Sequence, residues 1–466
     1  MSRKGGIISG GFQPLKAPDA PTIDSVSAGV LSADVTFSAP SNTGDGTIDS
    51  YVITAKQSDG TSASATASAA GTTSVSLTVG GTTTFAAQAL SEYGPGQFSG
   101  FGNSTSVPTG QELYTWGNGS DGRLGLNNTI NRSSPVQVGA LTTWSQVSAN
   151  GAQTFAIKTD NTLWSWGQGD NGRLGQNNAL YYSSPVQVGA LTVWSKVSAG
   201  SNHTAAIKTD GTLWTWGYGF RGQLGNNSTS PFNRSSPIQV GSLTDWYQVS
   251  AGSGHVASVK TDGTLWTWGF NNNGQLGLND IINRSSPVQV GSLTTWSQGL
   301  AGGACSAAIK TDGTLWMWGN NYYGNLGQND RVKRSSPVQV GSLTNWSQIS
   351  PGSNHTTAVK TDGTLWAWGL ATSGELGDSA IINRSSPVQV GALTTWAQAS
   401  SAFQWSAAVK TDGTLWTWGT EADGRLGQNV LIRRSSPVQV GSLTTWSQVS
   451  AAAAGSHAGA IQQSFT

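Results

Sequence analysis

The amino-acid sequence predicts an all-β fold, in which a seven-bladed β-propeller follows a small, immunoglobulin-like β-sandwich. Three observations predict it. Several sequence markers recur seven times with a period of about 50 residues, each unit contains short apolar stretches bounded by glycine turns, and the helical spacing of apolar residues at i, i+3 and i+4 is absent. A chain of 466 residues is also too long for one ordinary core, which favours a repeat array.

Three markers define the repeat. The first, Leu-Trp-x-Trp-Gly, begins at Leu113 (with Tyr for the first Trp), Leu163, Leu213, Leu265, Leu315, Leu365 and Leu415. The second, Ser-Ser-Pro-Val-Gln-Val-Gly, begins at Ser133, Ser183, Ser235 (with Ile for the first Val), Ser285, Ser335, Ser385 and Ser435. The third, Leu-Thr-x-Trp, ends at Trp144, Trp194, Trp246, Trp296, Trp346, Trp396 and Trp446. Their common period predicts one structural unit per repeat.

Each unit is expected to contain four short strands. Side chains alternate along a strand, so the indoles of Trp214 and Trp216 share one face, and Leu213 and Thr215 share the other. Asp210 and Gly211 precede this strand and predict a two-residue hairpin turn. Both faces are largely apolar, so both indoles are expected to be buried between blades, with about 4–6 kcal/mol as an upper bound for each.

The ends of the array predict a closed ring. The array begins in mid-unit, with the strands at Leu113 and Ser133, and it ends in mid-unit, with the strands at Trp446 and at 458–461. These halves complement one another, so one blade is expected to be built from both ends of the array. The alternative is an open β-solenoid, whose exposed edges would need polar caps.

The rest of the chain is assigned by its lack of the markers. Residues 17–108 show short alternating strands between Gly, Pro, Asn and Asp turns, which predict the β-sandwich. Residues 1–16 are interpreted as a flexible tail or anchor peptide, 109–112 as a linker and 113–466 as the propeller.

Charge and composition disfavour several classes of function. Lys and Arg number 24 against 23 Asp and Glu, and there is no basic block, so nucleic-acid binding is not expected. The single cysteine, Cys305, excludes an internal disulfide. No apolar run suits a secretory signal or a membrane span, so we expect synthesis in the cytoplasm and no membrane insertion.

The repeat resembles the regulator of chromosome condensation family, whose members form seven-bladed propellers. The resemblance rests on the Gly-Arg-Leu-Gly turn, the Ser-Pro-Val-Gln-Val strand, the Ser-Ala-Gly-x-x-His strand and Leu-Trp-Thr-Trp-Gly, and it covers residues 113–463. Residues 17–108 are similar to a fibronectin type III module, through Ala-Pro-x-x-Pro-Thr-Ile and Val-Thr-Phe-Ser-Ala-Pro. One relative is a nucleotide-exchange factor for a small GTPase, but the projecting wedge that it uses is not visible in this sequence.

A ring of residues near the propeller axis is a first candidate site. If their strands line the central channel, as the resemblance implies, the ring consists of Gln153, His203, His255, Cys305, His355, Trp405 and His457. Four histidines and a cysteine could be imagined as metal ligands. No nearby carboxylates or close ligand spacings accompany them, so we favour a structural role and predict neither a metal nor another cofactor.

Repeated cations and variable loops are further candidates. Lysines precede the hairpin turns, and arginines precede most Ser-Ser-Pro strands; these could attract an anionic glycan, but local salt bridges are favoured. The loops after the Trp-Gly pairs differ between units, and a rigid scaffold that presents variable loops is typical of binding proteins. Their candidate binding residues are Phe220, Arg221, Phe270, Tyr322 and Tyr323.

The sequence contains no catalytic constellation, so a non-enzymatic protein is expected. Its surface composition resembles that of an adhesin, although no export signal is present. We therefore interpret it as a phage virion component, made in the host cytoplasm, whose tail and sandwich contact other virion proteins and whose propeller recognises a host-surface glycan or protein. The alternatives are an intracellular scaffold that regulates a small GTPase or another protein partner, and a bacterial surface adhesin.

Overall fold

The computed structural model describes residues 16–29, 32–57, 60–77, 81–92, 94–107, 110–227 and 232–464, with the backbone alone for 103–107. The predicted tail lies outside these residues, apart from Lys16. The chain divides into two compact units, Met1–Gly110 with Gln463–Thr466, and Gln111–Gln462. The described residues are almost entirely strands and turns, which confirms the all-β prediction. None of their helices has the length and apolarity to span a membrane.

The first unit contains two sheets that share one core. One sheet has the order β1-β2-β5, and the other has the order β4-β3-β6-β7, with β8 paired to β6. Phe37 and Val35 of the first sheet and Ile53 and Phe85 of the second are buried in the same cluster. The strands are β1 (Thr22–Gly29), β2 (Ser32–Ser38), β3 (Ile48–Lys56), β4 (Ser62–Ala67), β5 (Gly71–Ser76), β6 (Gly81–Ser91), β7 (Gly94–Phe98) and β8 (Asn103–Val107).

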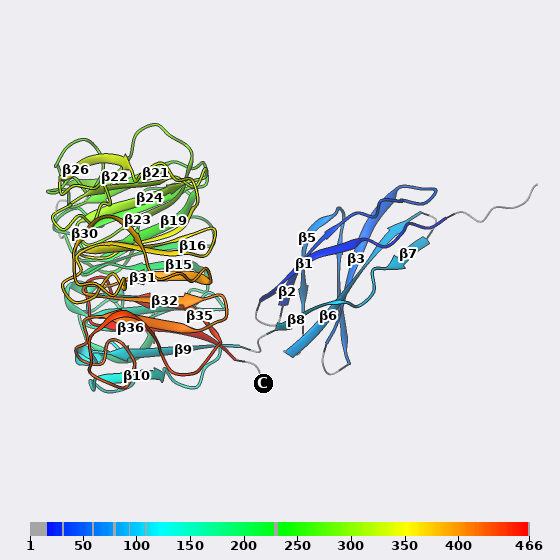
Figure 1. Cartoon of the computed structure of the whole chain (residues 1–466), viewed down its shortest axis with the longest axis horizontal. Helices are drawn as coiled ribbons and strands as arrows, with labels where there is room; N and C mark the ends of the chain where they lie inside the picture. The colour runs from blue at the N-terminus through cyan, green and yellow to red at the C-terminus, as the bar shows by residue number, and fades with distance from the viewer. Residues whose placement is uncertain are drawn as a thin grey trace, which may run out of the picture. The chain divides into compact units, whose positions relative to one another are not determined.

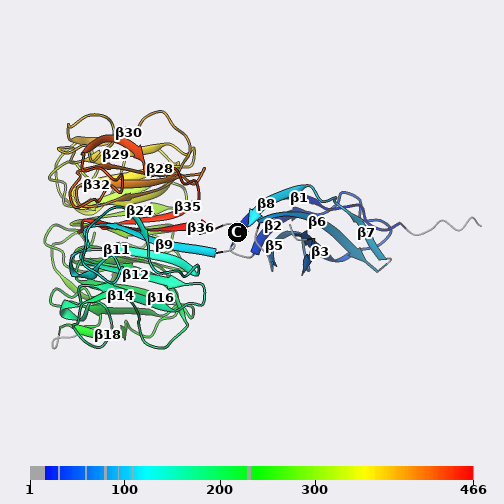
Figure 2. The same cartoon turned by 90° about the horizontal axis from the view of Figure 1, so that it is seen from below.

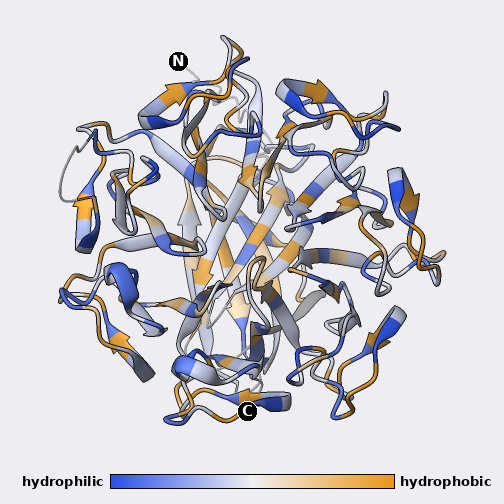
Figure 3. Cartoon of the chain, turned by 90° about the vertical axis from the view of Figure 1, so that its left-hand side faces the viewer, coloured by the Kyte–Doolittle hydropathy of each residue, from blue (hydrophilic) through white to orange (hydrophobic). Residues whose placement is uncertain are grey.

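The second unit repeats a four-stranded antiparallel sheet around a central axis (Figures 1 and 3). Six sheets are continuous in sequence, and the 3-10 turns η1 (Ser120–Gly122) and η2 (Asp170–Gly172) precede two of the outer strands. The sheets are β11 (Trp144–Asn150), β12 (Gln153–Lys158), β13 (Leu163–Gly167), β14 (Tyr182–Gln187); β15 (Trp194–Ala199), β16 (His203–Lys208), β17 (Leu213–Gly217), β18 (Arg234–Gln239); β19 (Trp246–Ala251), β20 (His255–Lys260), β21 (Leu265–Gly269), β22 (Arg284–Gln289); β23 (Trp296–Ala301), β24 (Cys305–Lys310), β25 (Leu315–Gly319), β26 (Arg334–Gln339); β27 (Trp346–Pro351), β28 (His355–Lys360), β29 (Leu365–Gly369), β30 (Arg384–Gln389); and β31 (Trp396–Ser401), β32 (Trp405–Lys410), β33 (Leu415–Gly419), β34 (Arg434–Gln439).

The remaining sheet, called here the composite sheet, is built from both ends of the array. It contains β9 (Gly110–Gly117) and β10 (Arg132–Gln137) together with β35 (Trp446–Ala451) and β36 (His457–Ser464), in the order β10-β9-β36-β35. Figures 1 and 2 show β9 beside β36. Sheet pairing between the two ends supports the closed ring over the open solenoid.

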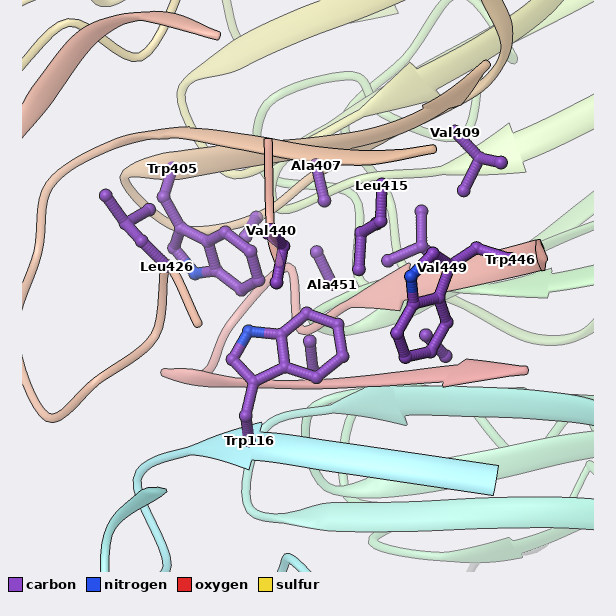
Figure 4. Close-up of a cluster of buried hydrophobic side chains, with 13 residues drawn as sticks. Trp116, Trp405, Ala407, Val409, Leu415, Leu426, Val440, Trp446, Val449 and Ala451 are labelled. Atoms are coloured by element: carbon purple, nitrogen blue, oxygen red, sulfur yellow. The ribbon is translucent and has the colours of Figure 1, made fainter. Parts of the chain in front are cut away.

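The composite sheet packs on its neighbour like any other sheet of the array. The indole of Trp116 lies in a cluster with Trp405, Leu426 and Val440 (Figure 4). Its Nε1 donates a hydrogen bond to the carbonyl oxygen of Arg425 in the preceding sheet, at 2.9 Å. Equivalent bonds of 2.8–3.1 Å run from Trp166, Trp268, Trp318, Trp368 and Trp418 to the carbonyl at the variable position of the preceding Gly-x-Leu-Gly turn.

The two indoles of each Trp-x-Trp pair differ in burial. Trp216 is fully buried, whereas Trp214 is half-buried, and the same difference holds in the other continuous units. Trp214 donates its Nε1 hydrogen to the hydroxyl of Thr212 at the rim. The prediction that both indoles are buried is therefore correct only for the second, because the first lies at the end of the strand near solvent.

The hairpin before each Trp-x-Trp strand is longer than predicted. The amide of Gly211 donates to the carbonyl of Lys208, and the amide of Lys208 donates to the carbonyl of Thr212, which makes a three-residue loop. Only Gly211 has a positive φ, of 76°. Asp210 instead accepts hydrogen bonds from the amide and hydroxyl of Thr212. The aspartate therefore stabilises the loop by side-chain bonding rather than by a left-handed conformation.

The innermost strands are joined by side chains. The strands β11, β15, β19, β23, β27, β31 and β35 contact one another in succession, and β35 contacts β11. Gln146 Oε1 accepts from the amide of Val197, and Ser148 Oγ accepts from the amide of Ala199. Across the closure, Gln448 and Ser450 accept in the same way from the amides of Val147 and Ala149. The repeated Gln-x-Ser therefore satisfies backbone groups that splayed sheets leave without strand partners.

Two of these interfaces depart from the rule. In β23, Leu300 replaces the serine, and Gln298 donates to the carbonyl of Ser347. In β15, Lys196 stands where the other innermost strands carry glutamine. Its ammonium donates to the carbonyl of Tyr247, but it has no acceptor for the amide of Val249. We expect Lys196→Gln to restore that bond and to raise the free energy of unfolding by about 1 kcal/mol, measured by urea titration. Ser195→Gln, one residue away, is the control and should not stabilise. An unchanged or lower free energy of unfolding for Lys196→Gln would show that this glutamine does not stabilise the contact between innermost strands.

Buried ring and candidate binding surface

The seven residues predicted to ring the channel, called here the buried ring, lie one strand away from it. Each begins the second strand of its sheet, and each is at most 1% exposed. The innermost strands separate them from the axis. The structure therefore places the ring inside the blade interfaces rather than along the channel, and corrects the expectation that these strands line it.

Histidines of the buried ring bond to the next sheet. His255 Nε2 lies 2.8 Å from the hydroxyl of Ser306, which itself donates to the carbonyl oxygen of Gln275. His355 bonds in the same way to Ser406, and His457 bonds to Thr154 across the closure. Val256 stands at the equivalent position after His203, and no bond of this type forms there. The hydroxyl residue after the ring position was a sequence signal for this network, which the sequence analysis missed.

Burial keeps the histidines and the cysteine of the buried ring uncharged. It lowers the pKa of His203 and His355 to about 4 and that of His255 and His457 to about 3. It raises the pKa of the Cys305 thiol to about 12. Removal from water disfavours the charged form of each group. The geometry and the charge state both indicate that the ring joins the sheets to one another.

The repeated lysines pack on tryptophans. The ammonium of Lys208 lies 3.6 Å from the centroid of the Trp214 ring and 5.2 Å from that of Trp194. The same arrangement recurs at Lys158, Lys260, Lys310, Lys360 and Lys410. An ammonium over an indole face is attracted by the ring quadrupole. These lysines therefore stabilise the partly exposed indoles, a contact that residue type alone did not predict.

Several of the repeated arginines are neutralised by aspartates, as the salt-bridge interpretation predicts. Arg284 contacts Asp280 at 2.5 Å, and Arg334 contacts Asp330 at 2.5 Å. Arg384 contacts Asp378 at 3.2 Å. Arg132 has no such acid, because Asn128 stands at the position of Asp280. The charge along the rim thus differs between sheets.

Three of the five predicted binding residues lie together. The ring of Phe220 lies 5.3 Å from that of Phe232, and the guanidinium of Arg221 lies 4.0 Å from the centroid of the Phe270 ring. The ring of Tyr218 lies 6.4 Å from that of Phe220, with the two ring planes tilted by 32°. These residues, called here the aromatic cluster, come from two neighbouring sheets, β15–β18 and β19–β22. Phe220 is 63% exposed.

Tyr322 and Tyr323 form a separate pair. Their ring centroids lie 4.8 Å apart with the ring planes at 85°, and Tyr322 is 67% exposed. The amide of Tyr322 donates to Asn320 Oδ1, which fixes the loop. They occupy the equivalent loop of sheet β23–β26. Sequence reasoning identified both sets as exposed aromatics, but it missed Phe232, because that residue joins the cluster only through the fold.

The comparisons agree with this architecture. Human WBSCR16 is 20% identical, with 76% of this chain and 100% of that chain covered at a TM-score of 0.69. Prp20p from Saccharomyces cerevisiae is 20% identical, with 77% and 92% covered at a TM-score of 0.68. No curated protein matched the sequence. A family model described as RCC1-like domain matches residues 112–460. This chain belongs to the RCC1-like domain family.

Proposed function

We propose that this chain is a non-enzymatic propeller scaffold that binds a protein partner through the aromatic cluster. The observation that carries the proposal is the exposure of Phe220 beside Phe232, with Arg221 held over Phe270. Aromatic and arginine side chains dominate the binding energy of protein interfaces. A cluster of this kind on a rigid set of loops supplies large contact area at a low cost in conformational entropy.

A small GTPase is the partner class that we favour. Prp20p binds Gsp1p and histones. A histone-type partner is strongly basic and calls for an acidic surface, whereas the aromatic cluster has Arg221 among its rings. A partner with a neutral or acidic patch fits this surface better. We infer an intracellular role for the chain on the same grounds.

The virion and adhesin hypotheses are less well supported. The relatives named above come from human and yeast, not from a phage or a bacterium, and the tail that would anchor the chain lies outside the described residues. The N-terminal unit is proposed to be a fibronectin type III-like module that acts as a spacer, because its two sheets share one core. Neither point requires a phage particle or a host-surface receptor.

Binding to a purified small GTPase tests the proposal. The full chain would be immobilised and its affinity measured by biolayer interferometry for the nucleotide-free, GDP-bound and GTP-bound forms. We expect Phe220→Ser to weaken binding by at least about ten-fold, since a central aromatic contributes about 2 kcal/mol or more. Leu431→Ser is the control, because Leu431 is 71% exposed in another sheet, in the segment before β34.

Two results would count against the proposal. Equal losses for Phe220→Ser and Leu431→Ser would show that the aromatic cluster is not the contact surface. Failure of every nucleotide state to bind, with both variants folded, would exclude this partner class. Copurification with phage particles, verified by mass spectrometry, would return support to the virion hypothesis.

A further inference from the structure

A pocket of about 540 Å³ lies between the composite sheet and its neighbour β11–β14, away from the aromatic cluster. We call it the cationic pocket. It is lined by Arg132, Gln137 and Leu141 on one side and by Lys158, Trp164 and Ser184 on the other. Ligand sites of small molecules have volumes of about 300–1,000 Å³. The pocket is therefore large enough for a sugar or another small organic molecule.

Pockets lined by corresponding residues recur between other sheets, at about 350–610 Å³, but their charge differs. In the equivalent pocket between β19–β22 and β23–β26, Arg284 is neutralised by Asp280. Between β11–β14 and β15–β18, Tyr182 replaces the arginine altogether. In the cationic pocket, Asn128 replaces the aspartate, and within the described part of the chain the Arg132 guanidinium makes a single bond, of 3.5 Å, to the carbonyl of Asn131. Arg132 thus retains its charge for a ligand.

Lys158 supplies the second charge. Its ammonium lies 3.9 Å from the centroid of the Trp164 ring, which positions the cation without neutralising it. The carboxylate of Asp160, in the neighbouring turn, attracts this ammonium. The Asp160 Oδ1, however, accepts hydrogen bonds from the amide and the hydroxyl of Thr162. The residues that line the pocket include no carboxylate. Two cations therefore face one cavity, and an anion is the complementary ligand.

The rest of the lining suits a sugar ring. The carboxamide of Gln137 is half-buried, and no hydrogen-bond partner of it is found among the residues that the structure describes. The Ser184 hydroxyl bonds only weakly, at 3.3 Å, to Asn127 Oδ1. Leu141, which is 48% exposed, and Pro185 give the pocket an apolar rim. Amide and hydroxyl groups bond sugar hydroxyls, and apolar side chains pack on the C–H face of a pyranose.

We propose that the cationic pocket binds an acidic sugar, a pyranose that carries a carboxylate. The carboxylate contacts Arg132 and Lys158, and the ring hydroxyls contact Gln137 and Ser184. A neutral sugar leaves both cations without a counter-charge. An acidic peptide side chain satisfies the cations, but it leaves the carboxamide and hydroxyl unused. This site is separate from the aromatic cluster and does not depend on the proposed protein partner.

The test substitutes Asn128, which does not itself line the pocket. Asn128→Asp introduces the carboxylate that Asp280 provides elsewhere, and the backbone bond that Asn128 Oδ1 accepts from Ile130 has its counterpart at Asp280. The change also removes the bond that Asn128 Nδ2 donates to the carbonyl of Leu126, and Asn178→Asp removes the equivalent bond to Gln176. Isothermal titration of the full chain with trigalacturonate should show binding that Asn128→Asp weakens on the order of ten- to a hundred-fold. Asn178→Asp, the same change one sheet further along, should bind like the original chain.

The choice of ligand completes the test. Maltotriose, a neutral trisaccharide, should not bind, and Lys158→Gln should weaken trigalacturonate binding as Asn128→Asp does. Equal affinity for a triglutamate peptide would make this an acidic-peptide site, and equal affinity for inorganic sulfate would make it a simple anion site; either overturns the proposal. Absence of trigalacturonate binding at millimolar concentration, with a native melting curve, overturns it as well.

Discussion

A chain that ends at Ser456, and so lacks β36, is expected to lose its cooperative unfolding transition. β36 lies between β9 and β35 in the composite sheet, so its removal leaves both neighbours with unpaired edges. It also removes the buried side chains of His457, Ala460 and Ile461 from the closing interfaces. The free energy that these contacts contribute should exceed the roughly 5–15 kcal/mol by which domains are stable against unfolding. Tryptophan fluorescence during urea titration would measure it.

The control for this truncation is a chain that ends at Ser464, which keeps all of β36. It should unfold with the midpoint of the full chain. A synthetic peptide of residues 455–466, added to the short chain, should restore the transition, because an added strand supplies the missing backbone hydrogen bonds. A short chain with an unchanged midpoint would show that the ring does not need the composite sheet.

The protein is also expected to unfold as the pH falls from about 6.5 to 4, before most carboxylates are protonated. The four histidines of the buried ring have pKa values of about 3 or 4 in the fold, against an ordinary value of 6.5. Between these values the unfolded chain binds more protons than the folded chain, so stability falls with pH. At pH 4 each of these histidines should lower the free energy of unfolding by about 3 kcal/mol.

A single substitution isolates this effect. Gln153 occupies the ring position in the first continuous sheet, so His355→Gln places a side chain that the repeat already uses at this position. At pH 7 the free energy of unfolding of the variant should be lower by about 1 kcal/mol, because the bond to Ser406 is lost. Between pH 6.5 and 4 the variant should lose about 3 kcal/mol less of this free energy than the original chain. Guanidinium titrations at each pH would measure both.

These four are the only histidines of the chain, so no exposed imidazole obscures the profile. Glu375 and Glu421 act in the opposite direction, because burial raises their pKa values, but their contribution is the same in the variant and the original chain. Identical pH profiles for His355→Gln and the original chain would show that the imidazole of His355 is not held neutral by the fold.

The repeat unit was predictable because its signals are local. Alternation assigns Leu213 and Thr215 to one face and the indoles to the other, and the half-units at Leu113 and Trp446 predicted the composite sheet. The burial of Trp214 was overestimated, because depth along a strand depends on the neighbouring sheet. The aromatic cluster was half predicted: Phe220 was visible as an exposed ring, but Phe232 lies beyond the loop and meets it only in space.

The sequence by itself determined the strands, the positions of the turns and their period, since each depends on residues that are neighbours in the chain. The tertiary structure decided which groups meet across the blade interfaces. His457 bonds Thr154 and Trp116 bonds Arg425 because the ring brings both ends of the array together. It also decided that Arg132 and Lys158 share one cavity, because charges on separate sheets become neighbours only when the sheets pack.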